Sequence, residues 1–278
     1  GESGSFNPVT GVSSVQEFGK VFISIKSTTG NFIPQVEKRR LVERLSPFTV
    51  ASITPVIVDP ETLFLILDVS STFNPNLTTL TSNDLESVIV NSLTNFNNNN
   101  LKTFNSAFRH SQVTKLIDDS DTSLTSNVTK VVMGKFFTPL LDESVGYTIS
   151  FNNSIYNPHS KHNSDQGGVV ASTGFKVSGD ATNEMFLDDD GNGYIRRFFI
   201  LAGVKNYLDD KAGTVDYATG TIKLNPLTVT LVSNVDNTSS TQIRITSIPD
   251  SVDIIPVRNQ LIEIDLINTI VNVSIDGA

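Results

Sequence analysis

The residues with the clearest potential for chemistry form the acidic run Asp188-Asp-Asp-Gly-Asn-Gly-Tyr-Ile195. Its spacing imitates the start of a calcium-binding EF-hand loop, because Asp188, Asp190 and Asn192 fall at liganding positions 1, 3 and 5. A glycine follows at position 6, as such loops require. The imitation fails at position 12, where Phe199 stands in place of a bidentate glutamate.

The other interpretation of this run is the tip of a β-hairpin. The flanking segments Met185–Leu187 and Tyr194–Ile200 resemble strands, whereas an EF-hand loop lies between helices. Glycine and asparagine supply the positive φ values of a tight turn. The favoured prediction for Asp188–Gly193 is a turn, and weak cation binding there stays an open alternative.

A second group of possible metal ligands is His159, His162 and Asp165. These residues lie in a polar segment without a helix to fix their geometry, and three ligands do not close a structural site. We therefore predict no metal site there. His110 lies near an expected helix and is assigned a packing or capping role.

The chain shows no signature of an enzyme. It has no cysteine, no Gly-x-Ser-x-Gly elbow, no Walker loop and no dinucleotide fingerprint. The carboxylate pairs Asp118-Asp119 and Asp209-Asp210 are sequence neighbours, whose side chains point apart on regular structure. The sequence therefore predicts no catalytic, cofactor-binding or metal-binding residue and no cofactor.

Composition indicates a soluble globular protein of about two domains. The 278 residues are 38% hydrophobic and 18% charged. No apolar run reaches the roughly 18–20 residues of a membrane helix, so no membrane partner is predicted. Residues 1–141 carry 11 basic and 12 acidic groups (net −1), and residues 142–278 carry 9 and 17 (net −8). This acidic balance argues against nucleic acid as a partner.

The first half of the chain predicts strands and helices in alternation. A strand (Val21–Ile25), a charged helix (Val36–Leu45), an extended run (Phe48–Val58) and an apolar strand (Leu63–Val69) are followed by an amphipathic helix (Leu85–Phe96), a short helix (Phe108–Ile117) and a strand (Val128–Phe137). The corner at Asp59-Pro60 is expected to close a hairpin. The order βαββαβ predicts a ferredoxin-like arrangement.

The second half changes rhythm near Leu141 and shows no convincing helix. The expected strands are Tyr147–Phe151, Gly168–Val177, Tyr194–Val204, Thr214–Tyr217, Thr221–Leu224, Thr228–Val232, Gln242–Ile248 and Leu261–Val273. Short strands at this spacing are typical of antiparallel sheets. The predicted fold class is thus α+β, with an N-terminal arm or linker (1–18), a ferredoxin-like domain (19–141) and a mostly antiparallel β domain (142–278).

Several segments, in order, resemble a known family. They are Gly19–Lys26, Pro55–Pro60, Phe73–Leu77, Leu101–Asp119 (with Phe104-Asn105, Phe108-Arg109 and Lys115–Asp118), Gly213–Ile222 and Ile255–Asn259. Together they resemble the C-terminal portion of the baseplate wedge proteins of contractile-tailed bacteriophages, within the wider baseplate J-like group. The resemblance spans most of residues 19–278.

The resemblance implies a structural subunit of the virion tail baseplate that is assembled in the host cytoplasm and has no catalytic residues. It further implies partners: copies of the chain itself, as a dimer and in a ring, and other wedge subunits. Such a subunit would link wedges and relay the change that triggers sheath contraction. The alternative function is a β-rich tail module that recognises a host-surface ligand.

Overall fold

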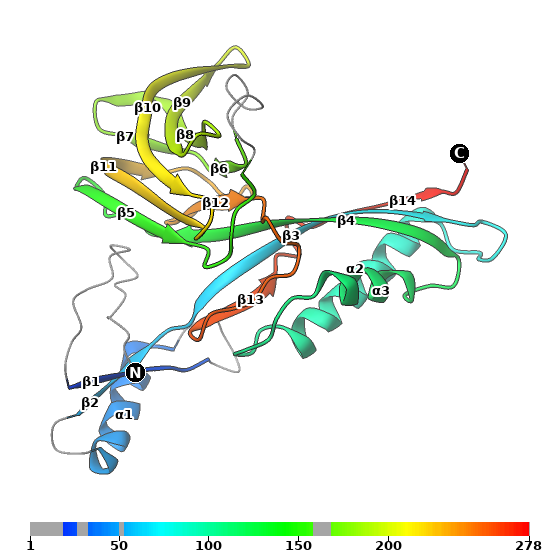
Figure 1. Cartoon of the computed structure of the whole chain (residues 1–278), viewed down its shortest axis with the longest axis horizontal. Helices are drawn as coiled ribbons and strands as arrows, with labels where there is room; N and C mark the ends of the chain where they lie inside the picture. The colour runs from blue at the N-terminus through cyan, green and yellow to red at the C-terminus, as the bar shows by residue number, and fades with distance from the viewer. Residues whose placement is uncertain (1–18, 27–32, 50–52, 158–167, 278) are drawn as a thin grey trace.

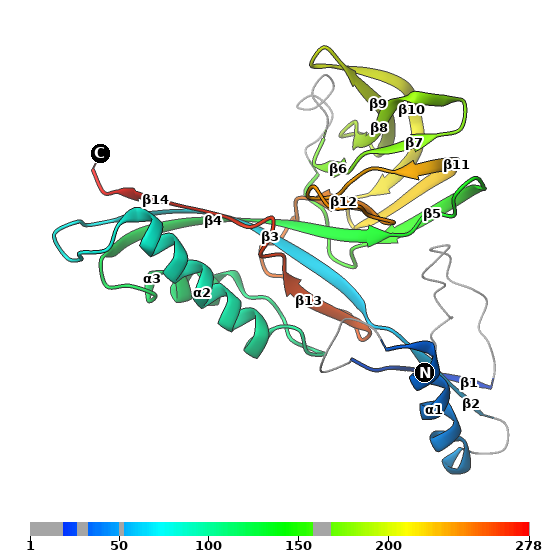
Figure 2. The same ribbon diagram turned by 180° about the vertical axis from the view of Figure 1, so that it is seen from behind.

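The computed structural model describes residues 19–26, 33–49, 53–157 and 168–277. The expected arm or linker at residues 1–18 lies outside the described residues. Figures 1 and 2 show three parts, which we call the N-terminal unit (19–58), the arm (59–137 and 259–277) and the β domain (138–258). The structure is α+β and consists mainly of strands.

The N-terminal unit is a small β-α-β module. It contains β1 (Lys20–Ser24), α1 (Gln35–Leu45), a 3-10 turn η1 (Ser46–Phe48) and β2 (Thr54–Val58). β1 and β2 pair in parallel, from Lys20 opposite Thr54 to Ser24 opposite Val58, and they form a two-stranded sheet of their own. The predictions of the first strand and the first helix are confirmed within one residue.

The arm is a two-layer structure in which helices cover one face of a sheet (Figures 1 and 2). Its elements are β3 (Glu61–Phe73), α2 (Ser82–Asn100), α3 (His110–Asp118), β4 (Leu124–Phe137), β13 (Gln260–Ile264) and β14 (Ile270–Ile275). Alternate residues of β3 and three apolar residues of α2 are completely buried: Leu63, Leu65, Leu67, Val69, Leu85, Ile89 and Leu93. The alternate residues of β3 lie on one face of the sheet and pack against the apolar stripe of α2. Together they form the core of the arm.

The β domain contains no helix in its described residues. Its strands are β5 (Ser144–Ser150), β6 (Val170–Ser172), β7 (Phe175–Val177), β8 (Asp180–Asp189), β9 (Tyr194–Leu201), β10 (Val204–Asp216), β11 (Thr221–Val232) and β12 (Ile243–Ser247). They pair antiparallel, and β12 joins β4, so the sheet of the β domain continues into the sheet of the arm.

The ferredoxin-like arrangement is not the topology observed. β2 and β3 would form a hairpin in the expected fold, but β2 pairs with β1 and β3 pairs with β4, β13 and β14. Asp59-Pro60 therefore joins two different sheets and closes no hairpin. The physical reason is competition between partners, because the long β4 and two returning strands fill both edges of β3.

The second half also departs from the expected strand limits. The two segments expected at Thr221–Leu224 and Thr228–Val232 are one strand, β11, with a register irregularity between Leu224 and Leu227. The segment Leu261–Val273 is broken into β13 and β14 by a turn in which Thr269 donates its N–H to the Asp265 carbonyl at 2.9 Å. Both strands run parallel to β3, so the end of the 142–278 segment completes the sheet of the first half.

A polar latch ties the β domain to the arm. Arg244 on β12 forms a two-pronged ion pair with Asp236, at 2.8 and 3.1 Å. Asn268, in the turn between β13 and β14, donates to Asp236 at 2.9 Å and to Asp265 at 2.8 Å. A second tie is Lys135, which contacts Glu61 at 2.6 Å and the Ser150 carbonyl at 2.5 Å.

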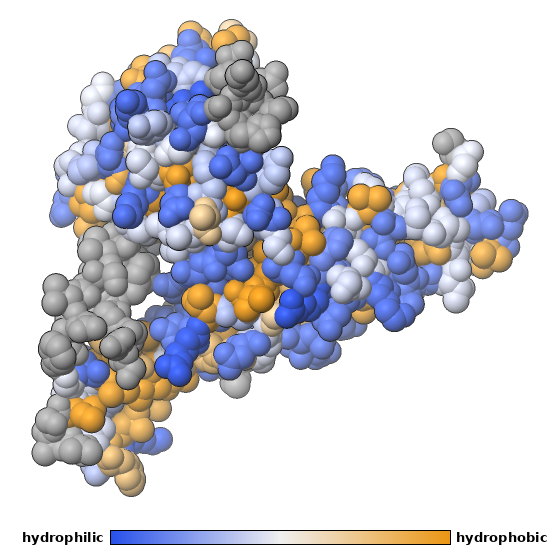
Figure 3. All heavy atoms as spheres, in the orientation of Figure 1, coloured by the Kyte–Doolittle hydropathy of each residue, from blue (hydrophilic) through white to orange (hydrophobic). Residues whose placement is uncertain are grey.

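The N-terminal unit adds nothing to the main core. None of its described residues belongs to the large apolar cluster of the arm and β domain. Figure 3 shows the arm and β domain largely hydrophilic at this face, whereas apolar surface gathers over the N-terminal unit. Within the described residues, no helix has both the length and the apolar character needed to cross a bilayer.

Candidate functional site

The run Asp188–Gly193 forms the turn of the β8–β9 hairpin. Asp189 lies opposite Ile195, and Gly191 and Gly193 have positive φ values of 74° and 104°. The Asp190 carboxylate accepts hydrogen bonds from the backbone N–H groups of Asn192 (2.7 Å) and Tyr194 (3.0 Å). The hairpin prediction is confirmed, and Asp190 closes the turn.

The Asp188 carboxylate is buried and fully engaged by cations and a hydroxyl. Its side chain is 4% exposed. One oxygen accepts from Arg196 Nε at 3.0 Å, and the other accepts from Lys205 Nζ at 2.8 Å and Tyr207 Oη at 2.9 Å. These partners occupy the oxygens that an EF-hand loop would turn toward calcium.

The Asp189 carboxylate is held on the opposite face of β8. It accepts from the Val170 N–H at 2.8 Å and from Tyr217 Oη at 2.5 Å, and the residue is completely buried. A Cβ at Gly168 would lie 1.9 Å from the Asp189 carboxylate, so the chain needs glycine there. The two adjacent aspartates thus anchor two separate parts of the β domain.

The two tyrosines act as permanent donors to these carboxylates. Burial, followed by the hydrogen bond to Asp188, raises the pKa of Tyr207 to about 12. Burial and then the hydrogen bond to Asp189 raise the pKa of Tyr217 well above its ordinary value of 10. Both hydroxyls therefore keep their protons at neutral pH, as a structural hydrogen bond requires.

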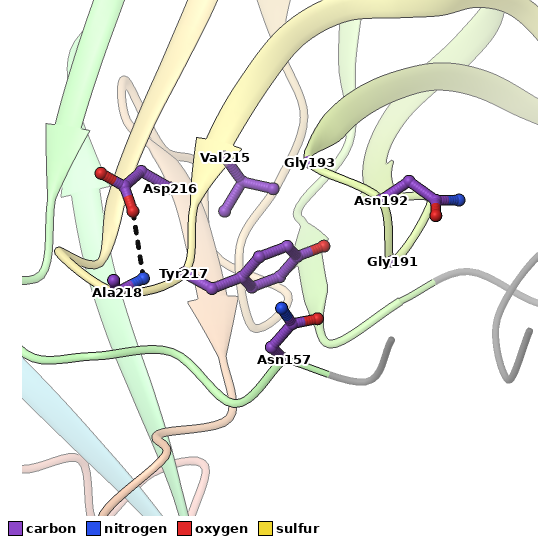
Figure 4. A pocket seen from close by; sticks show the side chains of 8 residues that line it. All are labelled: Asn157, Gly191, Asn192, Gly193, Val215, Asp216, Tyr217 and Ala218. Carbon is purple, nitrogen blue, oxygen red and sulfur yellow. Dashed lines mark hydrogen bonds between the residues drawn. The ribbon is translucent and has the colours of Figure 1, made fainter. Parts of the chain in front are cut away.

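A shallow hollow of about 620 Å³ lies beside this turn (Figure 4). Its described lining residues are Asn157, Gly191, Asn192, Gly193, Val215, Asp216, Tyr217 and Ala218. Asp216 turns away from it and accepts from the Ala218 N–H at 3.1 Å. Tyr217 is the single aromatic side chain in this lining, and its hydroxyl is already bound to Asp189. The hollow therefore presents few free polar groups to a ligand.

The remaining candidate residues include three histidines and one further aspartate. His159, His162 and Asp165 lie outside the described residues, and the described part of the chain gathers no group of three or more potential metal ligands. His110 begins α3, and its Nε2 lies 2.8 Å from the Thr129 carbonyl on β4. His110 therefore has the packing role expected of it.

The paired carboxylates occupy separate local structures. Asp118 accepts from Asn127 at 2.6 Å, and Asp119 forms an ion pair with Lys115 at 2.6 Å. Asp209 accepts from the Lys211 N–H at 2.9 Å within β10. Asp118 and Asp119 thus serve the end of α3, and Asp209 serves the backbone of β10.

The structure also shows exposed apolar side chains and ion pairs between segments, which no sequence pattern predicted. Arg244 and Asp236 are eight residues apart, and they meet Asp265 of the arm only in the folded chain. Exposed apolar side chains in the N-terminal unit include Val36 (60% exposed) and Phe48 (88%). These exposed side chains and long-range ties are features that the described residues add to the sequence-predicted candidates.

Two family models match consecutive segments of the chain. Residues 10–58, which contain the N-terminal unit, match the family described as baseplate structural protein gp6, C-terminal domain I. Residues 61–135, which run from β3 to β4, match baseplate structural protein gp6, C-terminal domain III. The two matches meet at Asp59-Pro60, where the two sheets are joined.

A curated relative points the same way. The chain is 26% identical over 115 residues to baseplate wedge protein gp6 of Enterobacteria phage T4. The chain is related to the C-terminal portion of phage baseplate wedge proteins. The match spans 41% of this chain and only 17% of the T4 wedge protein. The comparisons therefore relate the chain to structural proteins of a phage baseplate, over part of their length.

Proposed function

We propose that this chain is an assembly subunit of the baseplate wedge that associates with its own copies and with other wedge subunits. In this role it links wedges into a ring and relays the change that triggers sheath contraction. The observation that carries the proposal is the match of two consecutive segments to two domains of a baseplate structural protein.

The architecture supports a mechanical role. The Arg244 and Lys135 ties hold the β domain to the arm, so these two parts behave as one body. The N-terminal unit continues from this body through Asp59-Pro60 and stands apart from it in Figures 1 and 2. We propose that the domain division lies at this joint, and that the chain transmits motion as a rigid lever.

Electron microscopy of assembled tails tests the proposal. A label inserted at the Ala202-Gly203 turn between β9 and β10 lies in an exposed hairpin, so it leaves the core intact. We expect labels in a ring around the tail axis that change position between extended and contracted tails. Labels at the outer ends of the fibres would instead favour the alternative, a host-binding module.

The host-binding alternative makes a different prediction about ligands. Surface recognition of glycans uses aromatic side chains that line one hollow, and the described hollow offers Tyr217 alone. A glycan array probed with the intact chain separates the two functions. We expect no glycan to bind, and specific binding that is lost in a Tyr217→Ala variant would support the binding module.

A further inference from the structure

In its described residues, the N-terminal unit leaves much apolar surface exposed. Parallel sheets are normally covered on both faces, and a two-stranded sheet is only marginally stable by itself. No residue of α1 is buried, and Val21, Val36 and Phe48 remain 46%, 60% and 88% exposed. Such a concentration of apolar surface on a small unit indicates an interface.

The charge of the N-terminal unit is opposite to that of the rest of the chain. Residues 19–58 contain six basic and two acidic residues (net +4), whereas residues 59–278 contain 14 basic and 25 acidic residues (net −11). In α1, Arg40 pairs with Glu37, and Lys38 pairs with Asp59. Arg39 and Arg44 are exposed and have no ion-pair partner among the described residues. Arg39 and Arg44 thus lie on the same helix as the exposed Val36, and Arg44 precedes the exposed Phe48 by four residues.

The distant end of the arm is the matching acidic surface. Figure 1 shows that α2 begins and α3 ends at the end of the arm farthest from the N-terminal unit. Asp84 and Glu86 lie near the start of α2, Asp118 is the last residue of α3, and Asp119 is its C-cap. Each of these carboxylates has one partner within the chain: Thr81, the Val273 N–H, Asn127 and Lys115, respectively. Carboxylates at a helix C-terminus are unfavourable, because they add to the negative end of the helix dipole. Lys115 is the one cation in α3 that offsets them.

We propose that the N-terminal unit of one copy docks on the acidic end of the arm of a second copy. Opposite charges favour this orientation, and the like charges of two N-terminal units or of two arm ends disfavour the others. The docked surface would cover Val36 and Phe48 and would provide Asp118 and Asp119 with cations. The inference rests on the proposed self-association and names the surfaces that perform it.

Charge reversal in the intact chain tests the inference. Association is measured by sedimentation over a range of protein concentrations at low and high salt. We expect the Arg39→Glu/Arg44→Glu variant to weaken association by at least about tenfold at low salt, and high salt to weaken the wild type. The matched control, Lys211→Glu/Lys223→Glu, makes the same change of charge on the β domain and should associate as the wild type does.

Complementary variants separate the possible results. The Asp118→Lys/Asp119→Lys variant should also associate weakly, and mixing it with the Arg39→Glu/Arg44→Glu variant should restore association through the swapped pair. Unchanged or tighter association of the arginine variant would overturn the inference and leave self-association intact. A wild-type chain that stays monomeric at every concentration would instead contradict the self-association in the proposed function. Circular dichroism confirms that each variant is folded.

Discussion

At the scale of single residues, the aspartates of the run Asp188–Gly193 have structural roles. Asp188 and Asp189 are sequence neighbours on β8, and therefore point to opposite faces of the sheet. Asp188 meets Arg196, Lys205 and Tyr207, and Asp189 meets Val170 and Tyr217. A carboxylate is stable in a buried position only when it has such partners, so burial of these two aspartates requires these contacts.

Removing one donor from Asp189 should destabilise the fold. In a Tyr217→Phe variant the buried carboxylate keeps the Val170 N–H and loses its second donor, so we expect a loss of about 2 kcal/mol in the free energy of unfolding. Chemical denaturation measures this loss. Tyr156→Phe, at a side chain that is 45% exposed, is the control and should be nearly neutral. Equal effects of the two substitutions would contradict this account.

The hydrogen bond between Tyr217 and Asp189 also predicts that the stability of the fold depends on pH in the alkaline range. The folded-state pKa of Tyr217 is raised, so its contribution is complete below the ordinary tyrosine pKa of about 10 and disappears as the pH rises through the folded-state value. The difference in stability between wild type and Tyr217→Phe should therefore shrink in strongly alkaline buffer. A difference that grows with pH would reverse the sign of the argument.

Substitutions at two glycines distinguish the cost of backbone strain from the cost of steric crowding. Gly220 has a φ of +65°, and a Cβ there would lie 2.0 Å from the Asn153 carbonyl oxygen. Gly179 has a φ of +89° and open space around it. We expect Gly179→Ala to cost about 1 kcal/mol from strain alone, and Gly220→Ala to cost at least about 2 kcal/mol more. Thermal unfolding of the two variants measures both, and equal costs would exclude the close approach.

At the scale of elements, side chains at the edges of the arm sheet limit how other chains can pair with it. Glu86 on α2 accepts a hydrogen bond from the Val273 N–H on β14 at 3.2 Å, and His110 on α3 contacts the Thr129 carbonyl on β4. Covered edges discourage pairing with further strands. Each of the two contacts occupies one backbone group that a further strand would need for pairing.

The start of α2 depends on a reciprocal cap. The Thr81 hydroxyl accepts from the Asp84 N–H at 3.3 Å, and the Asp84 carboxylate accepts from the Thr81 N–H at 2.9 Å. We expect Thr81→Ala to reduce the free energy of unfolding by about 1 kcal/mol near neutral pH. The hydrogen bonds from Thr81, the hydroxyl first and then the backbone N–H, hold the pKa of Asp84 below its usual value.

The sign of the pH effect follows from that lowered pKa. The contribution of Asp84 is present above the carboxyl pKa of the unfolded chain and is lost as the pH falls through the folded-state pKa. The stability difference between wild type and Thr81→Ala should thus narrow in acid, as denaturation curves at several pH values will show. A gap that is constant down to the lowest pH would exclude Asp84 from the cap.

At the scale of the whole molecule, the latch around Arg244 determines whether the β domain and the arm move together. Arg244 is 14% exposed and Asp265 is 10% exposed, so removing the guanidinium leaves carboxylates in a poorly hydrated place. We expect Arg244→Gln to cost about 2 kcal/mol, less than a fully buried pair would. Amide exchange at the turn between β13 and β14 should accelerate.

Hydrogen exchange distinguishes the latch from general destabilisation. The exposed Lys223→Gln substitution is the control, and exchange at residues 265–269 should not change in it. A uniform acceleration throughout the Arg244→Gln variant would mean that Arg244 stabilises the fold without coupling its parts. Local acceleration would support the rigid-lever part of the proposed function.

The sequence alone determined the local elements and the absence of familiar catalytic motifs. Helical stripes such as Leu85, Ile89 and Leu93, the Thr81 cap and the hairpin at Asp188–Gly193 all follow from contacts within a few residues. The resemblance to baseplate wedge proteins also arose from ordered segments, and the family matches confirm it.

Only the tertiary structure decided which strands pair. β3 pairs with β4, β13 and β14 and not with β2, and the Arg244 latch joins residues 236–244 to the turn between β13 and β14. Strand pairing and buried ion pairs depend on which distant segments compete for the same strand edge or the same charged group. The hydrophobic periodicity of the sequence contains no information about that competition. The strand and helix of the N-terminal unit could be predicted from the sequence, whereas the exposure of its apolar side chains Val36 and Phe48 is known only from the tertiary structure.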